Sequence, residues 1–293
     1  MKAAGLIIDA LERSVEAEWL EQSLINFRKA GRRIHRAEEA LYPLCNSLEP
    51  VNRYFLEAPV HERAEEFAIS PSSTDSRGII HVGLDEHPYA RSGYSLYVPE
   101  TWNGATPLPL VVALHGGFSH GRDFVWTWLR EARSRCFLLA APSSRGITWS
   151  ITGPDFDSIL LHEMLEYIAA RWVLDEKRIL LTGLSDGGTY ALTRSLEERT
   201  PFTAFAVVSG VLPPFNLRHV ARRRIYWVHG ARDWMFPIWQ AKTGYNLLKA
   251  ADADITQVIL PDLYHAYPRE HNGAILSWFD PSLALPPAPG EHE

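Results

Sequence analysis

A chain of 293 residues, of which 46% are hydrophobic and 22% charged, has the length and composition of one large globular domain with a small accessory segment. Its formal net charge of −6 and its two widely separated cysteines disfavour a nucleic-acid-binding protein, a disulfide framework and a cysteine metal site. No run approaches the ~20 apolar residues that span a bilayer, and acidic residues interrupt any secretory signal near the N-terminus. We therefore expect a cytoplasmic protein without a membrane span.

The first 69 residues predict a helical extension. Apolar residues recur at helical spacing between Ile7 and Phe27, with charged residues between them. We expect Gly31 and the prolines at 43, 50 and 59 to divide the extension into about three helices. A lid, an arm that forms a homodimer and simple packing against a sheet are all open roles for it. We favour packing, so deleting residues 1–68 is expected to lower stability more than it alters chemistry.

The polar, turn-rich stretch from Ser70 to Gly78 predicts a boundary, after which strand-like and helical patterns alternate up to residue 285. Predicted strands cover residues 93–98, 108–114, 137–141, 178–181, 205–209, 225–229 and 256–260, and predicted helices cover 157–170, 189–198, 238–250 and 272–279. This alternation implies an α/β fold, with a mainly parallel central sheet covered by helices on both faces. The proline-rich residues 286–293 predict a disordered tail.

The sequence Thr-Gly-Leu-Ser-Asp-Gly-Gly at residues 182–188 contains the strongest functional signal. It places Ser185 between Gly183 and Gly187, directly after an apolar strand. This pattern is typical of a nucleophile elbow, where a strand turns sharply into a helix with the serine at the apex. Glycines two positions away on either side avoid collisions with neighbouring main chain. Ser185 is therefore the candidate nucleophile.

A serine nucleophile needs an imidazole to accept its proton and a carboxylate to orient that imidazole. Asp233 follows one predicted strand and His265 follows the last one, which gives the order serine, acid, histidine along the chain. The carboxyl ends of parallel strands meet at one edge of a sheet, so we expect the three side chains to converge there. Asp233 could instead cap the helix that begins near Pro237, and Asp262 is the second candidate for the acid.

The sequence Leu-His-Gly-Gly-Phe at residues 114–118 ends another predicted strand. A tetrahedral oxyanion needs two backbone N–H donors, one after the nucleophile and one from such an earlier loop. We expect Asp186 and Gly117 to supply these oxyanion-hole donors, with Phe118 as the alternative register. His115 is expected to brace the loop through hydrogen bonds.

Taken together, these segments resemble the α/β-hydrolase family over about residues 90–280. The likeness rests on Leu-His-Gly-Gly at 114–117, Gly-Leu-Ser-Asp-Gly-Gly at 183–188, Gly-Ala-Arg-Asp at 230–233 with Pro237, and His265 before a helix that ends in Ser-Trp-Phe at 277–279. Within the family the phospholipase/carboxylesterase branch is the most similar, with some likeness to polymer depolymerases and feruloyl esterases. The branch often has another residue where this chain has Asp186. The resemblance implies an α/β-hydrolase fold and a serine esterase that forms an acyl-enzyme intermediate without a cofactor.

Aromatic residues are plentiful in the segments predicted near the functional edge of the sheet, and the chain has 10 tryptophans. We expect Phe118, Trp149 and Trp234 to contact a small-molecule ester with an apolar body, although core packing explains several such residues equally well. The same triad could serve a peptidase or a thioesterase, and the fold could serve a ligand-binding protein of low turnover. No spacing of histidines or carboxylates predicts a metal site.

Overall fold

The computed structural model describes residues 2–15, 20–67 and 77–286. The chain divides between residues 74 and 75 into two compact units, an N-terminal unit and a sheet unit. Almost all of the predicted connector, and the predicted tail beyond residue 286, lie outside the described residues. In the described part of the chain, no helix is both long enough and apolar enough to span a bilayer.

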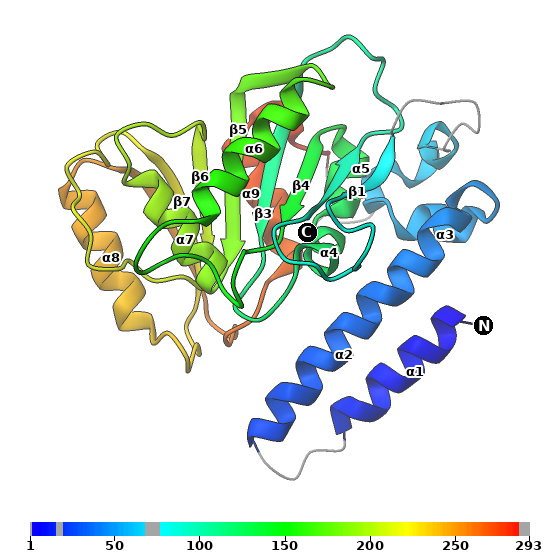
Figure 1. Cartoon of the computed structure of the whole chain (residues 1–293), viewed down its shortest axis with the longest axis horizontal. Coiled ribbons are helices and arrows are strands. Elements are labelled where there is room, and N and C mark those ends of the chain that lie inside the picture. The colour runs from blue at the N-terminus through cyan, green and yellow to red at the C-terminus, as the bar shows by residue number, and fades with distance from the viewer. Residues whose placement is uncertain (1, 16–19, 68–76, 287–293) are drawn as a thin grey trace. The chain divides into compact units, whose positions relative to one another are not determined.

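The N-terminal unit is helical, as its amphipathic spacing predicts. Its α-helices are α1 (Lys2–Val15), α2 (Leu20–Leu41) and α3 (Glu49–Tyr54), and two 3₁₀ helices cover Tyr42–Asn46 and Ala58–Phe67. Each proline lies in the first turn of a new element, where its missing N–H leaves no bond unmade. Helices α1 and α2 lie side by side (Figure 1).

The predicted helix break at Gly31 is wrong, because α2 continues through it. A side chain at this position would meet no other atom within 4 Å, so the glycine sits on an open stretch of helix. Glycine costs only about 1 kcal/mol relative to alanine in such a place, which is too little to end a helix of this length.

The sheet unit is built on eight strands in the order β1-β2-β4-β3-β5-β6-β7-β8. The strands are β1 (Gly78–Val82), β2 (Tyr94–Val98), β3 (Leu108–Leu114), β4 (Leu138–Pro142), β5 (Leu174–Leu184), β6 (Ala204–Val208), β7 (Arg224–Gly230) and β8 (Asp254–Leu260). The pairs β1–β2 and β2–β4 are antiparallel, and the strands from β4 to β8 are parallel. The predicted α/β class and its mainly parallel sheet are confirmed.

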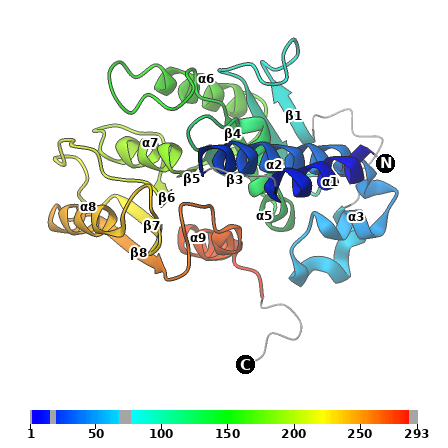
Figure 2. The same ribbon diagram turned by 90° about the horizontal axis from the view of Figure 1, so that it is seen from below.

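Helices cover both faces of this sheet. The α-helices of the unit are α4 (Gly121–Phe124), α5 (Leu129–Arg135), α6 (Asp157–Ala169), α7 (Asp186–Ser195), α8 (Ile238–Ala250) and α9 (Asn272–Phe279), and short 3₁₀ helices cover Val125–Thr127, Arg269–His271 and Pro281–Leu283. Figure 2 shows α6 and α7 on one face and α5 and α9 on the other. Strands β3, β4 and β6 are buried along their whole length, which explains their uninterrupted apolar sequences.

The sequence predicted each strand of this sheet except β1, and it assigned no helix to the segment that forms α4 and α5. Strand β1 is a short, half-buried edge strand that pairs only with β2, so its pattern is weak. Helix α4 has four residues, and α5 ends at Cys136 in a left-handed conformation without a glycine to signal it.

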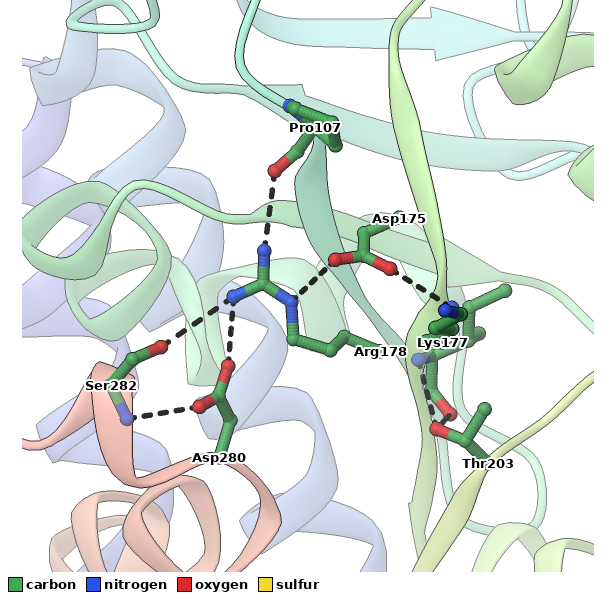
Figure 3. Close-up of polar contacts among 8 residues, drawn as sticks. Pro107, Asp175, Lys177, Arg178, Thr203, Asp280 and Ser282 are labelled. Carbon is green, nitrogen blue, oxygen red and sulfur yellow. Dashed lines mark hydrogen bonds and ion pairs between the residues drawn. The ribbon is translucent and has the colours of Figure 1, made fainter.

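Strand β5, which leads to Ser185, is anchored at its start by Arg178 (Figure 3). The guanidinium donates to Asp175 at 2.7 Å, to Asp280 beyond α9 at 2.9 Å, and to the Pro107 carbonyl before β3 at 3.3 Å. One side chain thus joins the beginnings of two central strands to the segment after the last helix. These contacts lie near the beginnings of the strands, opposite the ends that lead to Ser185, where they support the fold.

Candidate active site

Ser185 is the single residue between β5 and α7, at the tip of a sharp turn. Its backbone has φ 56° and ψ −118°, a conformation that is costly for a residue with a side chain. A Cβ on Gly183 would collide with the backbone of Gly187, and a Cβ on Gly187 would collide with the carbonyl oxygens of Leu114 and His115. The glycines therefore let strand, turn and helix approach as closely as the elbow requires.

The structure brings the three predicted side chains together. His265 Nε2 lies 2.9 Å from Ser185 Oγ, and His265 Nδ1 lies 2.8 Å from Asp233 Oδ2. Ser185 and Asp233 are 7% and 5% exposed, so water has little access to either side chain. The three groups form one hydrogen-bonded line from carboxylate to hydroxyl.

Asp233 uses its two carboxylate oxygens for different purposes. Oδ1 accepts hydrogen bonds from the backbone N–H groups of Met235 and Phe236, at 3.0 and 2.8 Å, and so holds the turn before α8. Oδ2 is left to bind His265. Helix α8 has Pro237 as its N-cap and no side-chain cap, so the capping interpretation of Asp233 is wrong and Oδ1 holds the preceding turn instead.

Burial works to raise the pKa of Asp233, but the hydrogen bonds from His265 and from the Phe236 N–H outweigh burial and hold that pKa below its ordinary value. The carboxylate therefore stays charged beside the imidazole. Asp262, the second candidate acid, is 84% exposed and pairs with Arg232 at 2.8 Å instead.

A second buried imidazole, which sequence reasoning missed, lies beside the acid. His229 Nε2 is 2.8 Å from the Phe236 carbonyl and 3.6 Å from Asp233 Oδ2. Because the carbonyl can only accept, the Nε2 atom carries the proton. Burial lowers the pKa of His229, so the ring stays neutral and does not compete with His265 for the carboxylate. Its sequence position, on a buried strand and four residues before the loop acid, gives no sign of this.

The loop at residues 115–118 is held by hydrogen bonds from the segment after β4. His115 Nδ1 donates to the Gly116 carbonyl at 2.7 Å, and its Nε2 accepts from the Ser144 N–H at 3.1 Å. Burial lowers the pKa of His115 to about 3, so both bonds are made by a neutral ring. The predicted bracing by His115 is thus observed. The Phe118 N–H donates to the Ile147 carbonyl at 2.7 Å, so the alternative register at Phe118 is already hydrogen-bonded.

Asp186 is the first residue of α7, so its N–H has no partner within the helix and lies at the positive end of the helix dipole. Its side chain turns toward the facing loop: Oδ2 accepts a 2.5 Å hydrogen bond from Thr148 Oγ1 and lies directly beside Gly117. A side chain on Gly117 would occupy the place of this carboxylate.

Asp157 and Thr148 are two further residues that the sequence did not reveal. The fully buried Asp157 carboxylate accepts from the N–H groups of Arg145 and Ser150, each at 2.7 Å, and from the Ser150 hydroxyl at 2.8 Å. It thereby shapes the loop that carries Thr148. Because the partners lie 7 and 12 residues away and Asp157 begins a helix, its pattern resembles an ordinary acid in a first helical turn.

The three aromatic residues expected at the substrate have different surroundings. Trp149 is only 2% exposed: its indole N–H donates to the His115 carbonyl at 2.7 Å, and its ring stacks on Tyr190. Its burial corrects the expectation of substrate contact, because the ring supports the loop from within the core. Phe118 and Trp234 are about half exposed, at 54% and 52%.

A groove of about 600 Å³, which we call the α7–α8 groove, opens beside the elbow. It is lined by Ile151, Asp186, Thr189, Val211–Pro214, Phe215, Leu217, Phe236, Trp239, Gln240, Thr243, Gly244 and Leu247. Its size is typical of sites for small molecules. Within the described residues, no cluster of histidine, cysteine or carboxylate groups could hold a metal ion.

Comparison with known proteins agrees with this fold. Residues 157–280, which include Ser185, Asp233 and His265, match the phospholipase/carboxylesterase family. No curated protein sequence matches the chain. Among solved structures, a thermostable esterase shares 20% identity at a TM-score of 0.50, and esterase PE8 also shares 20% at 0.50. The acylaminoacyl peptidase of Pyrococcus horikoshii shares 17% at 0.53.

These structural matches cover 61%, 62% and 67% of this chain. They cover 52% of the thermostable esterase, 95% of esterase PE8 and 40% of the peptidase, so the chain spans about half the length of the first of these proteins. At such identities the likeness shows the fold. The chain has the α/β-hydrolase fold, and residues 157–280 are similar to the phospholipase/carboxylesterase family.

Proposed function

We propose that this protein is a serine hydrolase that cleaves carboxylic esters through an acyl-enzyme intermediate. The observation that carries the proposal is the position of His265, whose two ring nitrogens lie within hydrogen-bond distance of Ser185 Oγ and Asp233 Oδ2. This is the arrangement in which a serine is activated as a nucleophile. The family match over residues 157–280 supports the same chemistry.

In the first stage Ser185 Oγ attacks the ester carbonyl carbon while His265 Nε2 accepts the hydroxyl proton. Asp233 holds Nδ1–H and balances the charge of the imidazolium. The tetrahedral intermediate collapses when His265 gives its proton to the departing alkoxide oxygen, which leaves as an alcohol. Ser185 then carries the acyl group.

In the second stage His265 removes a proton from water, and the resulting hydroxide attacks the acyl-enzyme carbonyl. The carboxylic acid leaves, and Ser185 recovers its proton from His265. We assign stabilisation of both oxyanions to the backbone N–H groups of Asp186 and Gly117. The position of Asp186 at the first turn of α7 supports this assignment, because the helix dipole also favours negative charge there.

A fluorophosphonate probe tests the nucleophile directly, because an activated serine displaces its fluoride and becomes a phosphonate ester. We expect stoichiometric labelling at Ser185 in the native protein and none in Ser185→Ala. Absence of labelling in a folded native protein would contradict the proposal and would favour a ligand-binding protein of low turnover.

The class of bond is tested with an ester, a thioester and an amide that share one acyl group. We expect the ester to have the highest kcat/KM, since an alcohol is a better leaving group than an amine and the family match is to carboxylesterases. A larger kcat/KM for the amide would instead identify a peptidase, and one for the thioester a thioesterase.

A further inference from the structure

The α7–α8 groove starts at the reacting groups. One wall begins at Asp186, directly after Ser185, and another includes Phe236, whose ring meets the ring of His265 edge to face at 5.2 Å between centroids. A substrate whose carbonyl lies at Ser185 can therefore extend one of its two arms into this groove.

The lining of the groove is almost entirely uncharged. Its walls are aliphatic and aromatic, with two threonines and a glutamine. Phe215 and Trp239 stand at 50% and 62% exposure, so their faces are open to contact. Such a surface gains free energy by burying an apolar group and gains little from a polar one.

Asp186 is the one charged residue among those that line the groove. Thr148 holds its carboxylate through a hydrogen bond, and no lysine or arginine in the described part of the chain pairs with it. The groove thus has a fixed negative charge at the end nearest the reacting carbonyl.

We propose that the α7–α8 groove binds the larger, apolar and uncharged arm of the ester, and that the Asp186 carboxylate excludes arms that carry a negative charge. The inference rests on the proposed function of Ser185 and adds the substrate class. An anionic arm would lose hydration in the groove and meet a like charge without a compensating cation, so both effects act against it.

The experiment compares 4-nitrophenyl esters of adipic acid whose far carboxyl is either free or methylated. A second pair places the free or methylated carboxyl on the alcohol arm. For the native enzyme we expect kcat/KM to be on the order of tenfold lower for the anionic member of at least one pair, the size typical of like charges in a partly solvated site. In Asp186→Asn, which keeps the backbone N–H, this difference should shrink several-fold.

Asp262→Asn is the matched control, because it also removes one carboxylate near the site but on an exposed loop. It should keep the native ratio between anionic and neutral esters. Equal kcat/KM for both members of both pairs in the native enzyme, or an unchanged ratio in Asp186→Asn, would overturn the inference. Fluorophosphonate labelling of Ser185 is measured on the same samples. If the enzyme is labelled but shows either of these results, only the inference about the groove fails. If the protein is not labelled, the esterase proposal fails.

Two exposed aromatic residues test the groove independently of charge. Trp239 lines the groove, and Phe156 is similarly exposed but does not line it. We expect Trp239→Ala to lower kcat/KM for a 3-phenylpropanoate ester several-fold relative to an acetate ester, and Phe156→Ala to leave this ratio unchanged. The same ratio in both variants would show that the groove does not hold the larger arm.

Discussion

The two sides of the site are built by different means. On the side of the nucleophile, close backbone contacts at Gly183 and Gly187 fix the position of Ser185. On the side of the oxyanion loop, side chains from distant parts of the chain do the work: His115 bonds to Ser144, and Asp157 bonds to the backbone of its loop. The first side depends on close backbone contacts within the elbow and with the end of β3, and the second depends on a network of hydrogen bonds.

This difference has a physical consequence. A backbone collision cannot be relieved by moving one side chain, whereas a hydrogen-bond network can lose one member and keep its overall shape. Damage to the nucleophile side should therefore abolish activity, and damage to the oxyanion side should lower it in steps.

The largest effect is expected at the carboxylate that orients His265, the partner of the nucleophile. Asp233→Asn should lower kcat by roughly 10⁴-fold, because an amide that donates toward Nδ1 favours the wrong tautomer of the ring. Asp262→Asn should stay within a few-fold of the native enzyme, since its partner is Arg232. Steady-state kinetics and circular dichroism of both variants provide the measurement, and the opposite ranking would identify Asp262 as the acid.

The nucleophile side is tested by adding one methyl group. In Gly187→Ala the new Cβ would press on the carbonyl oxygens of Leu114 and His115, so Ser185 must shift. We expect the rate of fluorophosphonate labelling to fall by about two to three orders of magnitude or the protein to lose stability by several kcal/mol.

Gly31→Ala is the matched control, because its Cβ would enter open space on α2. It should raise stability slightly, by about 0.5–1 kcal/mol, and leave the labelling rate unchanged. Native-like labelling and stability in Gly187→Ala would show that backbone contact does not fix the elbow.

The oxyanion side is tested at Asp157, whose carboxylate is fully buried and accepts hydrogen bonds from Arg145 and Ser150. Asp157→Asn replaces one accepting oxygen with a donor that faces backbone N–H groups, so the loop that carries Thr148 should loosen. We expect kcat to fall by about ten- to a hundredfold with KM changed less, because stabilisation of the oxyanion matters in the transition state. A smaller decrease of kcat in Thr148→Val, again with KM changed less, would show that the effect arises in this loop. A rise in KM alone would contradict it.

The same contrast explains what could be predicted from the sequence. Local patterns predicted the parallel strands and the elbow at Ser185. The order of the strands then predicted that Asp233 and His265 follow strands that end at the same edge of the sheet. The structure brings these three residues together as expected. Thr148 acts through Asp186, which is near only after folding, whereas Asp157 and His229 have partners close by in the sequence but resemble an ordinary acid of a first helical turn and an ordinary residue of a buried strand. Trp149 shows the same limit, because a tryptophan near the functional edge can face the substrate or the core.

The smallest effect concerns pH and again lies on the oxyanion side. Since burial lowers the pKa of His115 to about 3, the folded protein keeps this ring neutral, while the unfolded chain binds a proton below about pH 6.5. The contribution of the neutral His115 ring to the free energy of unfolding is therefore complete above pH 6.5 and is lost progressively as the pH falls from 6.5 toward 3. In that range this ring lowers the free energy of unfolding by about 1.4 kcal/mol per pH unit. His115→Asn keeps a donor near Nδ1 and removes the titration, so its unfolding free energy should fall less steeply with acid.

Urea unfolding of the native protein and of His115→Asn between pH 7 and pH 4.5 measures this difference in slope. The exposed His162 supplies the control, because His162→Asn should reproduce the native slope. Equal slopes for all three proteins would mean that His115 accepts a proton in the folded state. In that case a neutral His115 ring would not join the oxyanion loop to Ser144. The contrast between a side fixed by backbone contacts and a side held by hydrogen bonds would then lose this support.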